Sequence, residues 1–165
     1  MVSAMASDIV GDMAGVRRRA AGFTLPELMT VLAIIAMLCA MAAPSFGAMI
    51  AAQRTKGAAS DLFTALTRAR SEAIKRNTEV SLTPAATGWQ DGWRIPNPAD
   101  TGNLLDDHGP LTALTVSGPA GVVYLANGRL KGAATPSFQV AAGSAQARCI
   151  RIDLSGRPFQ TATAC

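Results

Sequence analysis

A long uncharged segment near the N-terminus constrains this chain more than any other feature. No charged residue occurs from Leu28 to Gln53, and Val31 to Ala43 is an unbroken apolar run. At about 1.5 Å per residue, a helix over this segment crosses a hydrocarbon core of about 30 Å. Arg17 to Arg19 precede it, and basic residues beside a membrane helix stay in the cytoplasm. The sequence therefore predicts one membrane helix, with the residues after 50 on the outer side.

Hydropathy leaves two simpler interpretations of this segment open. A basic region, an apolar run, and Ala40 and Ala42 spaced as a cleavage site ahead of Pro44 are compatible with a secretory signal peptide. An uncut membrane anchor is the second alternative. Glu27 argues against both, because a carboxylate between the arginines and the apolar run is unfavourable at a bilayer unless it has a partner.

An ordered motif surrounds Glu27. It reads GFTLPELM over residues 22–29 and is followed by the apolar run and Pro44-Ser45-Phe46. This motif resembles the class III signal of type IV pilins and type II secretion pseudopilins. The resemblance implies a leader peptide over 1–22, cleavage between Gly22 and Phe23 by a prepilin peptidase, and N-methylation of Phe23. We expect translation to start at Met13, which opens a shorter and more basic leader.

Glu27 has a physical role in this scheme. The α-ammonium of a new N-terminal Phe23 and the carboxylate of Glu27 lie about one helical turn apart. In a staggered bundle the carboxylate of one subunit can therefore meet the ammonium of its neighbour. We expect Glu27 to set the register of assembly, which is the best attested use of a buried charge.

The helical pattern continues beyond the uncharged segment. Leu62, Leu66, Ala69 and Ala73 fall on one helical face, and we expect the helix to end near Asn77. The sequence DLFTALTRARSEAIKRNTEVSL (61–82) resembles the GspH/FimT branch of the family, in which a head strand follows the helix. The resemblance implies an α+β pilin fold, with a long N-terminal helix packed on an antiparallel β-sheet head. Residues 23–50 would be the transmembrane and filament-core half of the helix, and 51–165 the periplasmic or extracellular head.

From Glu79 onward, short apolar runs are separated by Gly, Pro, Asn and Asp. The predicted strands cover 80–83, 92–95, 111–116, 122–125, 137–141, 149–154 and 158–163. Turns are predicted at Asp91-Gly92, Asn127-Gly128 and Ser155-Gly156, and an irregular loop over 96–110. We expect Trp89 and Trp93 to pack in the core and at a sheet edge.

The cysteines fit an oxidising exterior. Cys39 lies in the apolar run and is expected to behave as a small hydrophobe. Cys149 and Cys165 both fall in the exported head and predict a disulfide that ties the C-terminal segment to a neighbouring strand. Closing a loop of this size contributes about 3 kcal/mol.

The sequence gives little support to catalysis. His108 is the only histidine, and beside Asp106 and Asp107 it is expected on the solvated surface rather than as a general base. Three cysteines and one histidine do not make a zinc site. We expect no catalytic residue, no metal and no cofactor.

Basic residues gather in the C-terminal third, where Asp153 is the only acid after Asp107. Some FimT-like members bind DNA during uptake through a Gly-Arg-x-Arg segment. The matching residues here are 156–159, with Phe159 in place of the second arginine, so a tight turn with an exposed Arg157 is the favoured interpretation. A DNA-binding minor pilin for natural transformation, acting through Arg148, Arg151 and Arg157, is the alternative function.

The resemblance implies a non-enzymatic minor pilin or pseudopilin. It would be inserted once in the bacterial inner membrane, with a cytoplasmic N-terminus and a periplasmic head. It would then assemble near the tip of a type II secretion pseudopilus or a type IV pilus. The implied partners are the prepilin peptidase, other minor pilins or pseudopilins, the filament assembly platform and the inner membrane, with DNA under the alternative.

Overall fold

The computed structural model describes residues 22–143 and 147–165, and for 42–44 and 101 it describes the backbone alone. The chain divides into two compact units, Met1–Ala40 and Met41–Cys165. The predicted leader lies outside the described residues apart from Gly22, as do Met13 and Arg17 to Arg19.

The helix α1 spans Leu25–Arg76, so the predicted end near Asn77 is confirmed. Asn77 takes a positive φ of 52°, a conformation that asparagine adopts more readily than most residues. The Thr78 N–H then donates to the Ala73 carbonyl at 3.2 Å and closes the helix end. The predicted apolar face is also confirmed, because Leu62, Leu66, Ala69 and Ala73 are all fully buried.

One four-stranded antiparallel sheet follows the helix, in the order β3-β2-β1-β5. Its strands are β1 (Val80–Ala85), β2 (Gly88–Asn97), β3 (Asp100–His108) and β5 (Val122–Tyr124). The strand predicted over 80–83 is confirmed with two further residues. The strand predicted over 92–95 is the middle of the longer β2.

The prediction of an irregular loop over 96–110 is wrong, because most of that segment is β3. Its strand pairing is irregular, with register shifts on both sides of Pro96, which removes the regular alternation expected from a strand. The predicted turn at Asp91-Gly92 is also wrong, since both residues lie inside β2. A Cβ on Gly92 would stand 2.0 Å from the His108 carbonyl oxygen. This glycine therefore permits the close approach of β3 rather than a chain reversal.

A second four-stranded antiparallel sheet has the order β4-β6-β7-β8. Its strands are β4 (Thr115–Ser117), β6 (Ser137–Ala141), β7 (Arg148–Ile152) and β8 (Pro158–Thr161). The prediction of a single sheet is thus corrected to two. The strand over 137–141 has its predicted bounds, whereas the one predicted from Leu111 begins only at Thr115.

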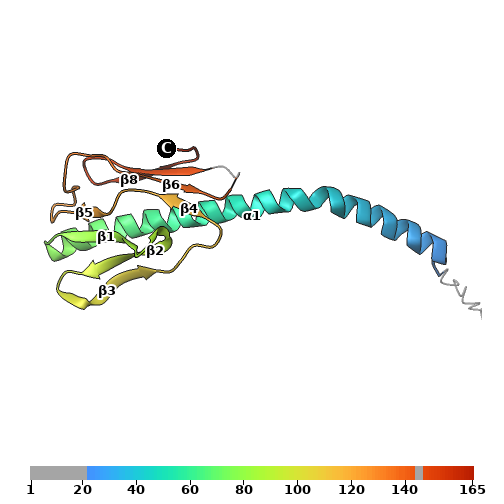
Figure 1. Cartoon of the computed structure of the whole chain (residues 1–165), viewed down its shortest axis with the longest axis horizontal. Helices are drawn as coiled ribbons and strands as arrows, with labels where there is room; N and C mark the ends of the chain where they lie inside the picture. The colour runs from blue at the N-terminus through green and yellow to red at the C-terminus, as the bar shows by residue number, and fades with distance from the viewer. Residues whose placement is uncertain (1–21, 144–146) are drawn as a thin grey trace, which may run out of the picture. The chain divides into compact units, whose positions relative to one another are not determined.

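Both sheets and the second half of α1 share one hydrophobic core. In the view of Figure 1, β2 and β3 lie on one side of α1, and β6 and β8 on the other. The core residues include Leu66 from the helix, Trp93 from the first sheet and Phe138 from the second. Trp89 meets Phe138 edge to face, with ring centroids 4.8 Å apart, and its indole N–H donates to the Pro119 carbonyl at 2.7 Å. The core packing predicted for Trp89 and Trp93 is confirmed. The predicted position at a sheet edge is wrong, because β2 lies between β3 and β1.

Candidate functional sites on the helix and the head

The start of α1 holds the predicted processing motif. Gly22, Phe23 and Thr24 precede the helix, and the Phe23 side chain is 80% exposed. The Thr24 N–H donates to Oε2 of Glu27 at 3.4 Å, which is half of a capping box. Glu27 thus closes the first turn of its own helix, and the peptide bond after Gly22 lies outside that turn.

Large apolar side chains are exposed along the described part of α1 from Leu25 to Ile50. Exposed fractions are 54% at Leu28, 52% at Ile34 and 62% at Phe46. When the parts of α1 before and after residues 42–44 are taken separately, no single helix among the described residues has both the length and the apolar content needed to cross a membrane. Taken together, Leu25–Met41 and Ser45–Arg76 meet the requirement by length and composition.

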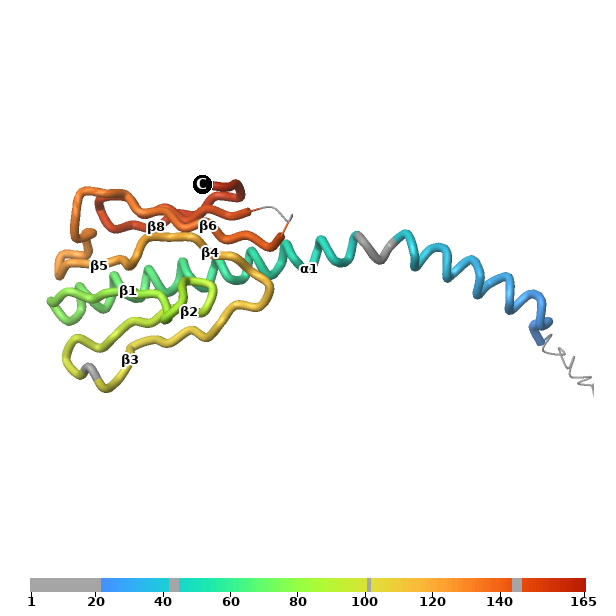
Figure 2. Tube along the Cα trace, in the orientation of Figure 1, coloured from blue at the N-terminus to red at the C-terminus, as the bar shows by residue number. Residues whose placement is uncertain are grey.

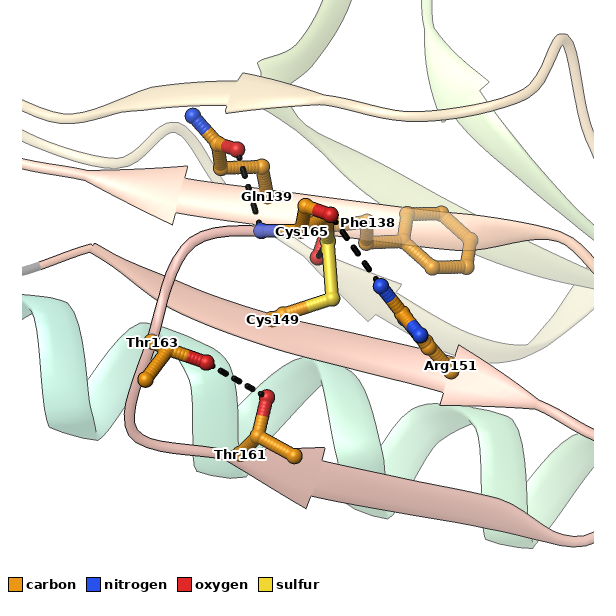
Figure 3. The surroundings of a disulfide bond; sticks show 7 residues. All are labelled: Phe138, Gln139, Cys149, Arg151, Thr161, Thr163 and Cys165. Carbon is orange, nitrogen blue, oxygen red and sulfur yellow. Dashed lines mark hydrogen bonds between the residues drawn. A yellow bond between two sulfur atoms is a disulfide. The ribbon is translucent and has the colours of Figure 1, made fainter.

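The predicted disulfide joins Cys149 to Cys165 (Figure 3). It covers β7 with the C-terminal segment, and Cys149 is buried beneath it. Two further contacts hold this segment: the Cys165 N–H donates to Oε1 of Gln139 at 3.3 Å, and Nη2 of Arg151 donates to the Cys165 carbonyl at 3.1 Å. The free Cys39 is exposed on the apolar helix.

The three arginines proposed for DNA do not form one surface. Strand β7 pairs in regular register with β6 and β8, so its side chains alternate between the two faces of the sheet. Arg148 shares the face of the buried Ile150, and Arg151 shares the opposite face with Cys149. Arg157 follows the other end of β7, in the turn that leads to β8.

Arg70, which the sequence did not mark as important, joins the turn before β8 to a second hairpin turn. Nε of Arg70 donates to the Gly128 carbonyl at 3.0 Å, and its Nη2 donates to the Ser155 carbonyl at 3.4 Å. The predicted turns at Asn127-Gly128 and Ser155-Gly156 are confirmed, with positive φ at both glycines. Hydrogen bonds from the Ser155 hydroxyl and the Arg157 N–H lower the pKa of Asp153. The Arg70 contacts link α1 to both sheets, and only the fold brings these residues together.

The single histidine packs on a tryptophan rather than lying free in a loop. The ring of His108 stacks on Trp93, with centroids 4.1 Å apart. Its Nδ1–H donates to the Gly109 carbonyl at 2.7 Å, and its Nε2 lies 3.7 Å from Oδ2 of Asp61. A hollow of about 310 Å³ opens here, and Arg68 and Asp106 pair across it at 2.9 Å. In the part of the chain that the structure describes, no group of three or more His, Cys, Asp or Glu residues is arranged to hold a metal ion.

Comparisons with known proteins agree with this architecture. A family model described as "Type II transport protein GspH" matches residues 58–156, and one described as "Prokaryotic N-terminal methylation motif" matches residues 17–43. A comparison with curated proteins found no match.

Two solved structures of the Pseudomonas aeruginosa (strain PAO1) type IV minor pilin FimU are similar to this chain. The crystal form in space group P21 has a TM-score of 0.59 and 22% identity, covering 66% of this chain and 89% of that one. The P65 form has a TM-score of 0.57 and 24% identity, covering 64% and 91%. At these identities the likeness shows the fold, so the predicted α+β pilin fold is confirmed.

Proposed function

The chain belongs to the GspH family of type II transport proteins, and we propose that it is a membrane-anchored precursor that is cut after Gly22 and built into a filament. The family comprises minor pilins and pseudopilins, which are structural subunits rather than enzymes. Its N-terminal methylation motif is that of a membrane-anchored protein that is assembled into a pilus or pseudopilus.

The exposed apolar surface of α1 carries this proposal. Side chains such as Leu28, Ile34 and Phe46 are more than half exposed, and burying each of them is worth about 1.5–3 kcal/mol. A surface of this kind requires a cover. Lipid supplies it while the chain is an inner-membrane protein, and the helices of neighbouring subunits supply it in the filament. We assign residues 23–50 to this anchoring and assembly role, and residues 51–165 to the periplasmic head.

Glu27 supports the register of assembly. In the described chain its carboxylate reaches only a backbone N–H, at the long distance of 3.4 Å. After cleavage, the α-ammonium of a neighbouring Phe23 offers a stronger, charge-assisted partner. If this ammonium replaced the backbone N–H as the partner of Glu27, removal of the leader would be coupled to docking of the subunit on its neighbour.

We place the assembled subunit near the tip of a type II secretion pseudopilus or a type IV pilus. Its partners are the prepilin peptidase before assembly, and the assembly platform and the other minor pilins or pseudopilins during assembly. The GspH match supports this, and the separation of Arg148, Arg151 and Arg157 gives DNA binding no comparable support.

Cleavage is tested by expressing the full chain with a prepilin peptidase and analysing the mature N-terminus by mass spectrometry. We expect the product to begin at Phe23 and to carry one added methyl group. Gly22→Val should block cleavage without disturbing the fold, because a Cβ at Gly22 would meet nothing within 4 Å. Gly57→Ala, where the space is equally open, should be processed normally. A mature end near Ala42 would refute the proposal in favour of a signal peptide.

Assembly is tested separately with Glu27→Gln. This variant keeps a side-chain oxygen for the Thr24 N–H and removes the charge, so cleavage should persist. Its recovery in sheared filaments, normalised to the membrane-bound pool, should fall about tenfold, the change expected from losing about 1.4 kcal/mol. Equal recovery of the variant and the wild type would contradict the assigned role of Glu27.

A further inference from the structure

A groove lies beside the point where α1 enters the head. It has a volume of about 410 Å³. Its walls are the helix residues Arg54, Gly57, Ala58 and Asp61 and the loop residues Pro110, Leu111, Thr112 and Leu114. We call this surface the shoulder. Figure 2 shows the connection between β3 and β4 crossing α1 at the end of the head from which the earlier helix residues emerge.

The helix changes character at the shoulder. Phe46, Met49 and Ile50 are 62%, 59% and 51% exposed. Arg54 and Lys56, which follow within two turns, are exposed and are the first charged residues after Glu27. An apolar helix face that ends in basic side chains is typical of the border between hydrocarbon and headgroups, where Lys and Arg extend toward lipid phosphates.

The loop of the shoulder, residues 109–114, carries no charge. The Leu111 N–H donates to the Gln90 carbonyl at 2.9 Å and ties the loop to β2. Ala113 has a φ of 58°, a conformation that is unfavourable for alanine and persists only where the surroundings hold it. Leu111 and Leu114 pack partly against the core, which leaves Pro110, Thr112 and Ala113 as an exposed, uncharged rim.

We propose that the shoulder rests on the headgroup layer of an anionic bilayer while the chain is anchored. Arg54 and Lys56 contact lipid phosphates, and the rim of the loop lies beside them. The only acid in the groove, Asp61, stands further along the helix from the apolar segment and faces His108 at 3.7 Å. Basic side chains near an anionic surface are attracted to it. This contact would fix the orientation of the head before assembly, and it rests on the proposed membrane anchoring.

Site-specific fluorescence of the full chain in lipid vesicles tests the contact. An environment-sensitive NBD label on the native Cys39 reports whether the helix is in hydrocarbon. In a Cys39→Ser background, the label is moved to the rim with Thr112→Cys. The matched control is Ala99→Cys, an exposed residue at the opposite end of β3. Vesicles contain phosphatidylcholine with or without phosphatidylglycerol, and a nitroxide on the headgroup quenches labels that lie in that layer.

We expect quenching of the residue-112 label to exceed that of the residue-99 label at least twofold in anionic vesicles. The excess should disappear at high salt and in Arg54→Gln/Lys56→Gln, while the Cys39 label stays in hydrocarbon. Equal quenching at 112 and 99 with Cys39 in hydrocarbon would overturn the shoulder contact and leave the anchoring intact. Quenching of the residue-112 label that does not change with salt or with lipid charge would overturn the role of Arg54 and Lys56. A Cys39 label in water would overturn the anchoring itself.

Discussion

Gly156 lies so close to Gly128 that no other residue fits in its place. A Cβ on Gly156 would stand 2.0 Å from the Gly128 carbonyl oxygen, and the glycine has a positive φ of 81°. The two glycines belong to hairpin turns of different sheets, and Arg70 binds the carbonyls of Gly128 and Ser155. This junction therefore joins the two sheets and the helix at one end of the head.

Gly156→Ala should destabilise the head by about 3 kcal/mol, because the change combines backbone strain with a steric clash against backbone atoms. Gly57→Ala is the matched control. Its Cβ meets nothing within 4 Å, and alanine in a helix is favoured over glycine by about 0.8 kcal/mol. Urea titration of the full chain in a mild detergent measures the free energy of unfolding of both variants. A Gly156→Ala variant as stable as the wild type would contradict the close approach.

Loss of the disulfide should also lower stability, through the unfolded state. Cys165→Ser leaves Cys149 buried as a small hydrophobe, and we expect a loss of about 3 kcal/mol. A reducing agent should lower the stability of the wild type by a similar amount and leave the variant unchanged. Cys39→Ser, which removes the exposed free thiol, should show wild-type behaviour in both conditions.

The elements that the sequence predicted well are those whose patterns are local. The apolar spacing of Leu62 and Leu66 marks the buried face of α1, and Asn77 marks its end. The segment Ser137–Ala141 alternates regularly and has its predicted bounds. The motif at Gly22 to Glu27 identified the family from side chains that make few contacts in the described chain.

The features that local patterns do not encode are those that depend on long-range pairing. Strand β3 is held by its pairing with β2 and by the stacking of His108 on Trp93. Its acidic composition is typical of a loop, so the sequence does not reveal the strand. Gly92 looks like a turn residue, although it serves the approach of β3. The shoulder and the Arg70 junction combine residues that are far apart in the chain, so neither has a sequence signature.

Tyr124 should be replaceable by phenylalanine at no loss. Its side chain is fully buried, and among the described residues its hydroxyl has no hydrogen-bond partner. Burial raises the pKa of this hydroxyl, so it stays neutral. Because an unsatisfied buried hydroxyl is unfavourable by about 1 kcal/mol or more, Tyr124→Phe should stabilise the head by about 1 kcal/mol. A clear loss of stability in the same urea titration would indicate that the hydroxyl is satisfied.

Duplex DNA should not bind the chain in the manner of a DNA receptor. Arg148 and Arg151 face opposite sides of β7, and Nη2 of Arg151 is engaged by the Cys165 carbonyl. We expect no shift in a gel titration at low salt, and no difference between the wild type and Arg157→Gln. Micromolar binding that weakens steeply with salt and with this substitution would instead favour the DNA-uptake function.

Acid should weaken the end of α1 through Glu72. Nε of Arg76 donates to its carboxylate at 2.6 Å and lowers the pKa of Glu72 below its ordinary value of 4.5, with Lys75 and Arg68 adding to the effect. A lowered folded-state pKa means that the stabilisation is present above about pH 4.5 and is lost as the pH falls through the folded-state pKa. The pair is worth about 0.5 kcal/mol. Glu72→Gln should therefore be less stable than the wild type at pH 7 by that amount, and the difference should shrink as the pH falls below 4.5 and vanish once the carboxylate is protonated in the folded state. A difference that persisted unchanged in acid would show that the carboxylate's charge is not its source.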